Sequence, residues 1–204
     1  LAEQPGGTLF LGNHSCWWDV FLAHFLNEAV PVEGYGLMEH FNLKRFGFFQ
    51  RIGCYSVDRS NPASVRAALS YTTLLLRRPR AGIWLFPQGR ILGNEVRPIR
   101  VQPGLRSVVR MGGRARLVTV ALKFEFWQEE RPEVFARFGP PTWVDRSDLA
   151  DLIPTWERRL TDELDALRED VLAQAPGRFE VLARGPRSIH ESYARLRERF
   201  RGPT

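Results

Sequence analysis

Short apolar runs alternate with longer amphipathic stretches along most of this chain. Strand-like runs are expected at residues 8–11, 54–57, 82–86, 117–122 and 133–138. Helix-like stretches are expected from an N-cap at Ser15 through Phe25, and at 62–77, 105–111, 154–175 and 188–200. Strands that alternate with helices usually pair in parallel through crossover connections. This order therefore predicts an α/β fold, with a mainly parallel central sheet flanked by helices.

The length of 204 residues suits one ordinary domain, which buries roughly 70% of the surface that its unfolded form exposes. A hydrophobic fraction of 44% and a charged fraction of 25% are typical of a globular protein rather than a disordered one. Since no repeat or long linker interrupts the pattern, we expect a single domain over 1–204. Its motif-bearing part covers about 8–122, and a C-terminal strand and helices fill 124–204.

Cys16 and Cys54 are the only cysteines, too few for a disulfide framework or a cysteine-based zinc site. This usage indicates a reducing compartment, so we predict a cytoplasmic location. No apolar stretch reaches the roughly 18 residues that span a bilayer, and the first seven residues lack the features of a signal peptide. We expect the chain not to cross a membrane. Because it begins at Leu1 rather than Met, a preceding membrane anchor stays an open alternative.

The net charge of +6 comes almost entirely from arginine. Three kinds of anionic partner fit this excess: nucleic acid, anionic lipid and a phosphorylated substrate. The charge alone does not choose between them, and a solvated arginine-rich surface without any such partner is the ordinary alternative.

A histidine and an aspartate follow the first expected strand. Five residues along a helix turn through about 500°, so His14 and Asp19 could not share one helical face. We therefore expect His14 in the strand-to-helix turn, where its ring can swing back to the Asp19 carboxylate. One ring nitrogen would then be held, and the other would be free to accept a proton. A capping histidine and a first-turn acid without a catalytic role are the structural alternative.

Two further segments carry motifs, residues 43–59 and Phe86-Pro87-Gln88-Gly89-Arg90. Together with Asn13-His14 and Asp19, they resemble the glycerol-phosphate and lysophosphatidate acyltransferase superfamily. That family has Asn-His-x-x-x-x-Asp, Gly-x-x-x-x-Asp-Arg, Phe-Pro-Glu-Gly-Thr-Arg and then an apolar strand with Val-Pro. Three of the four blocks occur here in the same order, and the resemblance covers about residues 9–122.

The resemblance implies an acyltransferase-like fold and an O-acyltransferase activity. A fatty acyl group would move from acyl-CoA or acyl carrier protein, the cosubstrate, to a hydroxyl of a lipid acceptor, without a metal or other cofactor. His14 would be the general base and Asp19 the acid that orients it. Arg59 would bind an anionic head group of the acceptor, because a guanidinium pairs bidentately with phosphate. The full set of implied acceptor-binding residues is Arg59, Gln88, Gly89 and Arg90.

The chain departs from the family pattern on the acceptor side. Gln88 stands in place of glutamate, Arg90 follows Gly89 directly where threonine is usual, and Val118-Thr119 replaces Val-Pro. A neutral amide can hydrogen-bond a hydroxyl but cannot act as a charged acceptor. The pattern thus predicts the reaction type and leaves the acceptor open between a lysophospholipid, a glycolipid and an isoprenoid alcohol.

Two points of the mechanism concern residues beside the base. Ser15 and Cys16 suggest a nucleophile, but neighbours at a helix start point apart and the family transfers the acyl group directly. Backbone amides near Gly89 or at the start of the first helix are candidate donors to the tetrahedral oxyanion.

His24, His40 and His190 lack a matching acidic or cysteine partner, so we assign them no catalytic or metal-binding role.

Aromatic and basic residues are interleaved between residues 41 and 51. They suit a membrane-surface patch, or alternatively a core beneath a basic rim. The same choice, between lining an acyl-chain tunnel and filling the core, applies to Trp17 and Trp18. We expect a peripheral protein at the inner face of the cell membrane. The sequence gives no indication of the oligomeric state. The residues of the expected patch are Phe41, Phe46, Phe48 and Phe49 with Lys44, Arg45 and Arg51.

Two other classes of function compete with the enzyme. A catalytically weak lipid-binding protein at the membrane surface is suggested by Gln88 and by the basic aromatic segment. A nucleic-acid-binding module is disfavoured, because it needs basic residues and exposed aromatics on one platform, whereas here they are scattered through an α/β pattern. We therefore predict no nucleic-acid partner.

Overall fold

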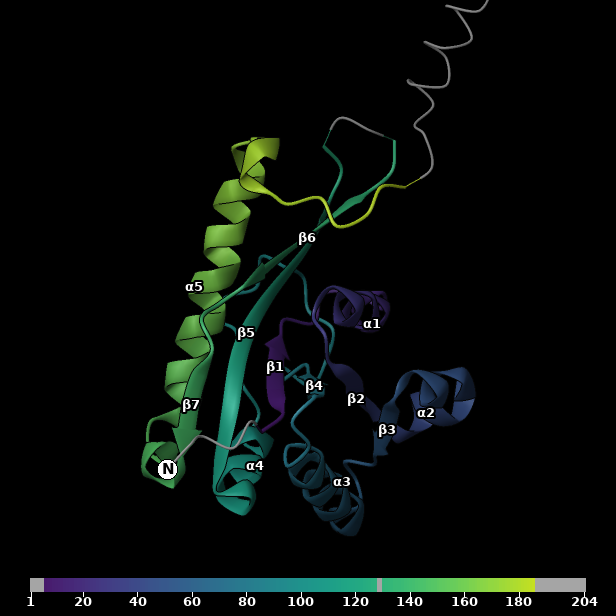
Figure 1. Cartoon of the computed structure of the whole chain (residues 1–204), viewed down its shortest axis with the longest axis vertical. Helices are drawn as coiled ribbons and strands as arrows, with labels where there is room; N and C mark the ends of the chain where they lie inside the picture. The colour runs from purple at the N-terminus through teal and green to yellow at the C-terminus, as the bar shows by residue number, and fades with distance from the viewer. Residues whose placement is uncertain (1–5, 128–129, 186–204) are drawn as a thin grey trace, which may run out of the picture.

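A seven-stranded, mostly parallel sheet forms the centre of the computed structural model, which describes residues 6–127 and 130–185 (Figure 1). Its strands are β1 (Thr8–Gly12), β2 (Glu33–Glu39), β3 (Cys54–Val57), β4 (Ala81–Leu85), β5 (Arg114–Glu125), β6 (Glu133–Phe138) and β7 (Thr142–Asp145). The helices are α1 (Asp19–Ala29), α2 (His40–Arg45), α3 (Pro62–Leu75), α4 (Gly104–Gly112) and α5 (Leu152–Leu172). Short 3-10 helices η1 (Gly47–Ile52), η2 (Arg146–Leu149) and η3 (Pro176–Arg178) complete the described elements.

The strand order is β3-β2-β4-β1-β5-β6, and β7 also pairs with β5. The pairs from β3 through β5 are all parallel, whereas β6 and β7 run antiparallel to β5. This arrangement confirms the predicted α/β fold with a mainly parallel sheet flanked by helices. None of the helices in the described part of the chain has both the length and the apolar composition that a membrane span requires.

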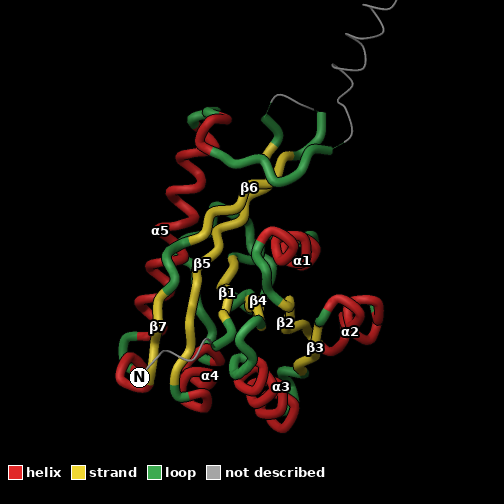
Figure 2. The backbone as a smooth tube through the Cα atoms, in the orientation of Figure 1, coloured by secondary structure: helices red, strands yellow, loops and turns green. Residues whose placement is uncertain are grey.

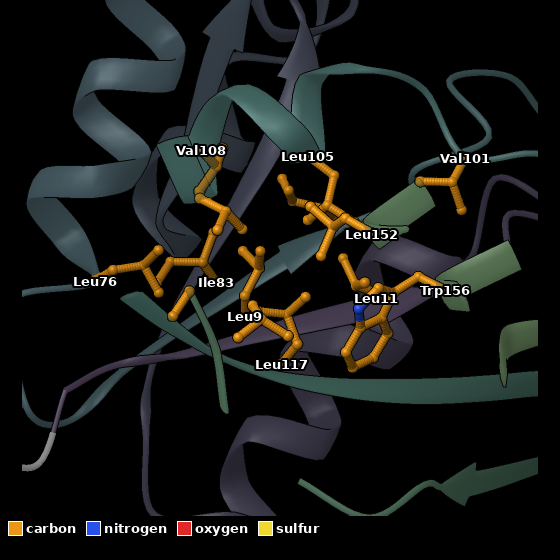
Figure 3. Packing of buried hydrophobic residues seen from close by; sticks show 14 of the residues in the cluster. Leu9, Leu11, Leu76, Ile83, Val101, Leu105, Val108, Leu117, Leu152 and Trp156 are labelled. Atoms are coloured by element: carbon orange, nitrogen blue, oxygen red, sulfur yellow. The ribbon is translucent and has the colours of Figure 1, made fainter. Parts of the chain in front are cut away.

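Helices cover both faces of the sheet (Figure 2). Alternate residues of β1 point to opposite sides, so Leu9 and Leu11 pack against α3, α4 and the start of α5, while Phe10 packs beneath α1. Figure 3 shows the first of these clusters, in which Leu9 and Leu11 meet Leu117 of β5. Every residue of β1 is buried, as expected for a central strand covered on both faces.

Two strands were missing from the sequence-based prediction. β2 contains Gly34 and Gly36, and glycine weakens the strand pattern because it supplies no side chain to pack. Gly34 is required sterically, since the Asn27 side chain occupies the space that its Cβ would fill. Asn27 in turn accepts a 2.8 Å hydrogen bond from Trp84 Nε1, which ties α1 to β4. β7 is four residues long and directly follows Gly139-Pro140-Pro141, a sequence that indicates a turn rather than a strand.

The start of α1 also differs from the prediction. Ser15 does not cap the helix, which begins at Asp19 with Trp18 at the N-cap position. The cause is the Asp19 carboxylate, which accepts hydrogen bonds from the Ser15 and Cys16 amides and so folds residues 15–18 into a turn. The other predicted elements are present with small shifts of their ends, except for the helix expected at 188–200, which lies outside the described residues.

Candidate active site

Four strands end at the same edge of the sheet because they run parallel. His14 follows β1, Gln88 lies in the loop after β4, Arg59 follows β3, and Glu39 ends β2. Functional groups of open α/β sheets gather at this carboxyl edge. The parallel order therefore brings together residues that are up to 74 positions apart in the sequence, such as His14 and Gln88.

His14 and Asp19 form a hydrogen-bonded pair. His14 Nδ1 lies 2.8 Å from Asp19 Oδ2, and the aspartate is fully buried while 19% of the histidine side chain is exposed. The imidazole stacks on the Phe86 ring at 4.7 Å between centroids. Nε2 makes no hydrogen bond with any residue in the described part of the chain. The arrangement is the one expected from the spacing, with one nitrogen held and the other open.

The Asp19 carboxylate organises the whole turn that precedes α1. Oδ2 accepts hydrogen bonds from the Ser15 amide at 2.6 Å and the Cys16 amide at 2.9 Å, in addition to His14. Oδ1 lies 3.3 Å from Ser15 Oγ and 3.5 Å from Cys16 Sγ. These donors satisfy the buried carboxylate and fix its direction toward the imidazole.

The backbone of the histidine turn is held by the loop after β4, and Asn13 binds β5. The His14 amide donates to Gln88 Oε1 at 2.7 Å, and the His14 carbonyl accepts from the Leu92 amide at 2.9 Å. Asn13 bonds both backbone groups of Leu122 in β5, accepting at 2.7 Å and donating at 2.9 Å. Asn13, which the sequence analysis used only as part of a motif, therefore holds the base in place.

Gln88 makes a contact with the histidine turn that the motif did not predict. Its side chain is almost fully buried, and its amide oxygen is occupied by the His14 backbone. A glutamate could accept the same hydrogen bond, so the departure from the family pattern leaves this contact intact. The Nε2 group has no hydrogen-bond partner among the described residues and remains a donor.

The Arg59 guanidinium is held on two sides. Its Nε donates to Glu39 Oε2 at 2.8 Å, and its Nη1 donates to the Gly89 carbonyl at 2.8 Å. Gly89 has φ +69°, and an added Cβ would lie 3.2 Å from Arg59 Nη1. Glycine is therefore needed at this position both for its backbone conformation and for the close approach of the arginine.

A cavity of about 460 Å³ brings the four predicted acceptor-binding residues together. Arg100, which no motif indicated, adds a third guanidinium to the wall of this cavity and lies 3.2 Å from Glu157. The volume is that of a small-molecule site, and its wall carries three guanidinium groups, of which Arg59 and Arg100 are each paired with a glutamate. The residues that line it are Arg59, Gln88, Gly89, Arg90, Leu92, Val96, Pro98, Arg100 and Gln102.

A second, apolar cavity lies between α1, β2 and β4, and Phe86 contributes to its wall. It measures about 20 Å³, which is room for about one water molecule. A long acyl chain does not fit into this space unless α1 moves away from β2.

Three of the backbone amides near Gly89 and at the start of the first helix are engaged in hydrogen bonds within the protein. The Gly89 amide donates to the Phe86 carbonyl at 3.0 Å, and the Ser15 and Cys16 amides donate to Asp19. A tetrahedral oxyanion would need other donors, and the free Nε2 of Gln88 lies at the same edge of the sheet.

Neither residue beside the base is prepared to act as a nucleophile. The Ser15 hydroxyl lies against Asp19 and makes no hydrogen bond with His14 in the described structure. Burial, and then the neighbouring Asp19 carboxylate, raise the pKa of the Cys16 thiol above its usual value. Because thiolates rather than thiols attack acyl carbon, this shift works against a covalent intermediate at Cys16.

Within the described ranges, no group of three or more histidine, cysteine, aspartate or glutamate side chains could hold a metal ion.

Fold and site together define an α/β protein with a histidine–carboxylate pair at the carboxyl edge of its sheet, beside an arginine-lined cavity. A family model described as Acyltransferase matches residues 2–123, which is more than half of the chain. The chain belongs to this family, the glycerolphosphate and lysophosphatidate acyltransferases, and is thereby assigned the transfer of an acyl group to a lipid. A search of curated proteins found no match.

Proposed function

We propose that the protein moves a fatty acyl group from acyl-CoA or acyl carrier protein directly to a hydroxyl of a lipid acceptor, with His14 as the general base. The observation that carries this proposal is the buried Asp19 carboxylate on Nδ1 combined with the open Nε2. The carboxylate fixes the tautomer in which Nδ1 bears the proton, so Nε2 presents a lone pair to the acceptor.

The proposed reaction has two steps. Nε2 takes the hydroxyl proton as the acceptor oxygen attacks the thioester carbonyl, and the C–O bond forms. The tetrahedral intermediate then collapses, the C–S bond breaks, and the leaving thiolate receives the proton from Nε2. General-base catalysis of this kind contributes typically about 10²- to 10⁴-fold. Asp19 stabilises the imidazolium between the two steps, and the proposed reaction uses no metal and no cofactor other than the thioester cosubstrate.

We propose a lysophospholipid-like acceptor whose anionic head group enters the arginine-lined cavity. Arg59, Arg90 and Arg100 supply the charge, and Arg59 is already oriented by Glu39 and the Gly89 carbonyl. A glycolipid or an isoprenoid alcohol would offer the same hydroxyl to His14 without using the arginines.

The location that we propose, at the inner face of the cell membrane, is supported by the two free thiols, which suit a reducing compartment.

The test is a thiol-release assay with acyl-CoA or acyl carrier protein and a panel of acceptors, with mass spectrometry of the lipid products. The proposal expects free thiol and acylated lipid in equal amounts, with a lysophospholipid as the best acceptor. Lipid binding without thiol release from either donor across the whole panel would instead support the catalytically weak lipid-binding protein.

The orientation of Arg59 leads to a prediction for acceptor binding. Arg59→Lys keeps the charge but loses the planar fork that contacts Glu39 and Gly89, so KM for a phosphate-bearing acceptor should rise about 10- to 100-fold. The value of kcat should change much less. Glu39→Gln should give a smaller rise in KM of the same kind. Arg178→Lys, an exposed arginine paired with Asp170, serves as the control. Equal kinetics for Arg59→Lys and the control would contradict the assignment.

The raised pKa of Cys16 leads to a second prediction. Cys16→Ala should transfer the acyl group at close to the wild-type rate, because the thiol is not part of the proposed reaction. In the wild-type protein, iodoacetamide should modify Cys16 more slowly than a free cysteine at pH values near the ordinary cysteine pKa, and faster as the pH rises further. An acyl-enzyme detected by intact-protein mass spectrometry and lost in Cys16→Ala would instead favour the covalent route.

A further inference from the structure

Aromatic rings from two separate segments form one continuous cluster on the outside of the molecule. Trp17 contacts Trp18 and Phe46, with ring centroids 5.8 and 5.5 Å apart, and Phe21 stacks on Phe48 at 6.0 Å. Trp18 contacts Phe21 of α1 at 5.4 Å, and the contact between Phe21 and Phe48 joins α1 to η1. We call these five residues, Trp17, Trp18, Phe21, Phe46 and Phe48, the aromatic face.

The aromatic face is open to solvent where a core cluster would be covered. Trp18 is 61% exposed, and Trp17 and Phe48 are exposed as well. Phe49, the neighbour of Phe48, is only 1% exposed and packs with Leu43 in the core below. Both alternatives given for the aromatic residues between 41 and 51 therefore occur. Phe49 lies in the core, and Phe48 lies on the surface.

Basic side chains border the aromatic face. Lys44 and Arg45 lie in the last turn of α2 and Arg51 in η1, and all three are exposed. The Arg45 guanidinium lies 5.2 Å from the centre of the Phe46 ring. Residues 40–53 contain no aspartate or glutamate, so the segment carries three positive charges that no acid of its own offsets. The nearest acids along the chain are Glu39, which is bound to Arg59, and Asp58, which accepts hydrogen bonds from the Ser60 amide and hydroxyl.

We propose that the aromatic face docks on an anionic lipid bilayer, with Trp17 and Trp18 at the level of the head groups. Tryptophan is suited to this depth because its large apolar ring carries one polar group. A second copy of the chain is a poorer partner for the surface, because two faces with the same positive charges would repel each other. The bilayer offers both apolar depth and negative charge.

The aromatic face lies next to the proposed general base along the chain. Trp17 and Trp18 follow His14 by three and four residues, in the turn that Asp19 fastens. A bilayer on this face would present lipid hydroxyl groups beside the base. This orientation rests on the proposed function, whereas the binding itself rests on the surface alone.

Vesicle flotation with the full chain tests the docking. The protein should float with phosphatidylcholine vesicles that contain phosphatidylglycerol, and less with pure phosphatidylcholine. Changing Lys44, Arg45 and Arg51 together to glutamine should weaken binding to the anionic vesicles by about 100-fold, since each basic residue contributes about fivefold. Trp18→Ser combined with Phe48→Ser should weaken binding to both kinds of vesicle. Leu172→Ser, an equally exposed apolar residue on α5, is the control and should bind as the wild type does.

Each result decides for or against the docking surface. Binding that is absent in the wild type, or unchanged in both sets of variants, would overturn it. A dimer in analytical ultracentrifugation that Trp18→Ser with Phe48→Ser dissociates, in a protein that does not float, would replace the bilayer by a second copy. Thiol release with a water-soluble short-chain acceptor separates the two proposals. Release without flotation contradicts only the docking, and flotation without release contradicts only the proposed reaction.

Discussion

His14→Gln is expected to lower kcat for acyl transfer by about 10²- to 10⁴-fold, the usual contribution of a general base. Glutamine can occupy the place of the ring and donate to Asp19, but its amide nitrogen has no lone pair that accepts a proton at neutral pH. KM for the acceptor should change little, because the arginine-lined cavity is untouched. Steady-state kinetics of thiol release measures both constants.

The matched control for this variant is His24→Gln, which changes an exposed histidine of α1 that lies outside the His14–Asp19 pair. It should retain wild-type kcat. Urea unfolding should show both variants close to the wild type, because glutamine at position 14 preserves the hydrogen bond to Asp19. A His14→Gln protein with unchanged kcat would rule out the base.

Asp19→Asn is expected to reduce kcat by about 10³- to 10⁴-fold, comparable to the loss of an orienting aspartate in a catalytic triad. The asparagine amide would donate to His14 Nδ1 and thereby move the ring proton to Nε2. The nitrogen that faces the acceptor would then carry a hydrogen instead of a lone pair. The loss of activity would therefore come from the wrong tautomer rather than from a displaced side chain.

The same change should also destabilise the fold. Asparagine has one acceptor oxygen for the Ser15 and Cys16 amides and the Ser15 hydroxyl, which the carboxylate now satisfies. A donor left without a partner costs about 1–3 kcal/mol, which urea unfolding detects. Ser15→Ala removes only the 3.3 Å contact to Oδ1 and should leave both activity and stability nearly unchanged. Full activity in Asp19→Asn would show that the aspartate is structural only.

The parts of the site that depend on local geometry could be predicted from the sequence. The His14–Asp19 contact follows from a spacing of five residues and the turn that this spacing requires. Outside the site, the helix expected at 62–77 also begins through a local contact, since the Asn61 side chain accepts from the Ala63 and Ser64 amides. The direction of capping before α1 could not be predicted, because the Asp19 carboxylate competes with Ser15 as the acceptor.

The parts that depend on strand order could not be predicted. Glu39 reaches Arg59 because β2 lies between β3 and β4, and the glycines of β2 hid that strand. Asn13 meets Leu122 across 109 residues of sequence. Gln88 supports the base through its amide oxygen because β1 and β4 are neighbours, and motif resemblance did not predict this contact. Such contacts become visible only when the sheet order is known.

Rescue of His14→Ala by imidazole tests the central claim most directly. The alanine leaves space between Phe86 and Asp19 in which a free imidazole can stack and donate to the carboxylate. We expect almost no thiol release from the variant alone, and a rate that rises and saturates as imidazole is added. A His14→Ala protein that transfers the acyl group at the wild-type rate without imidazole would contradict the account.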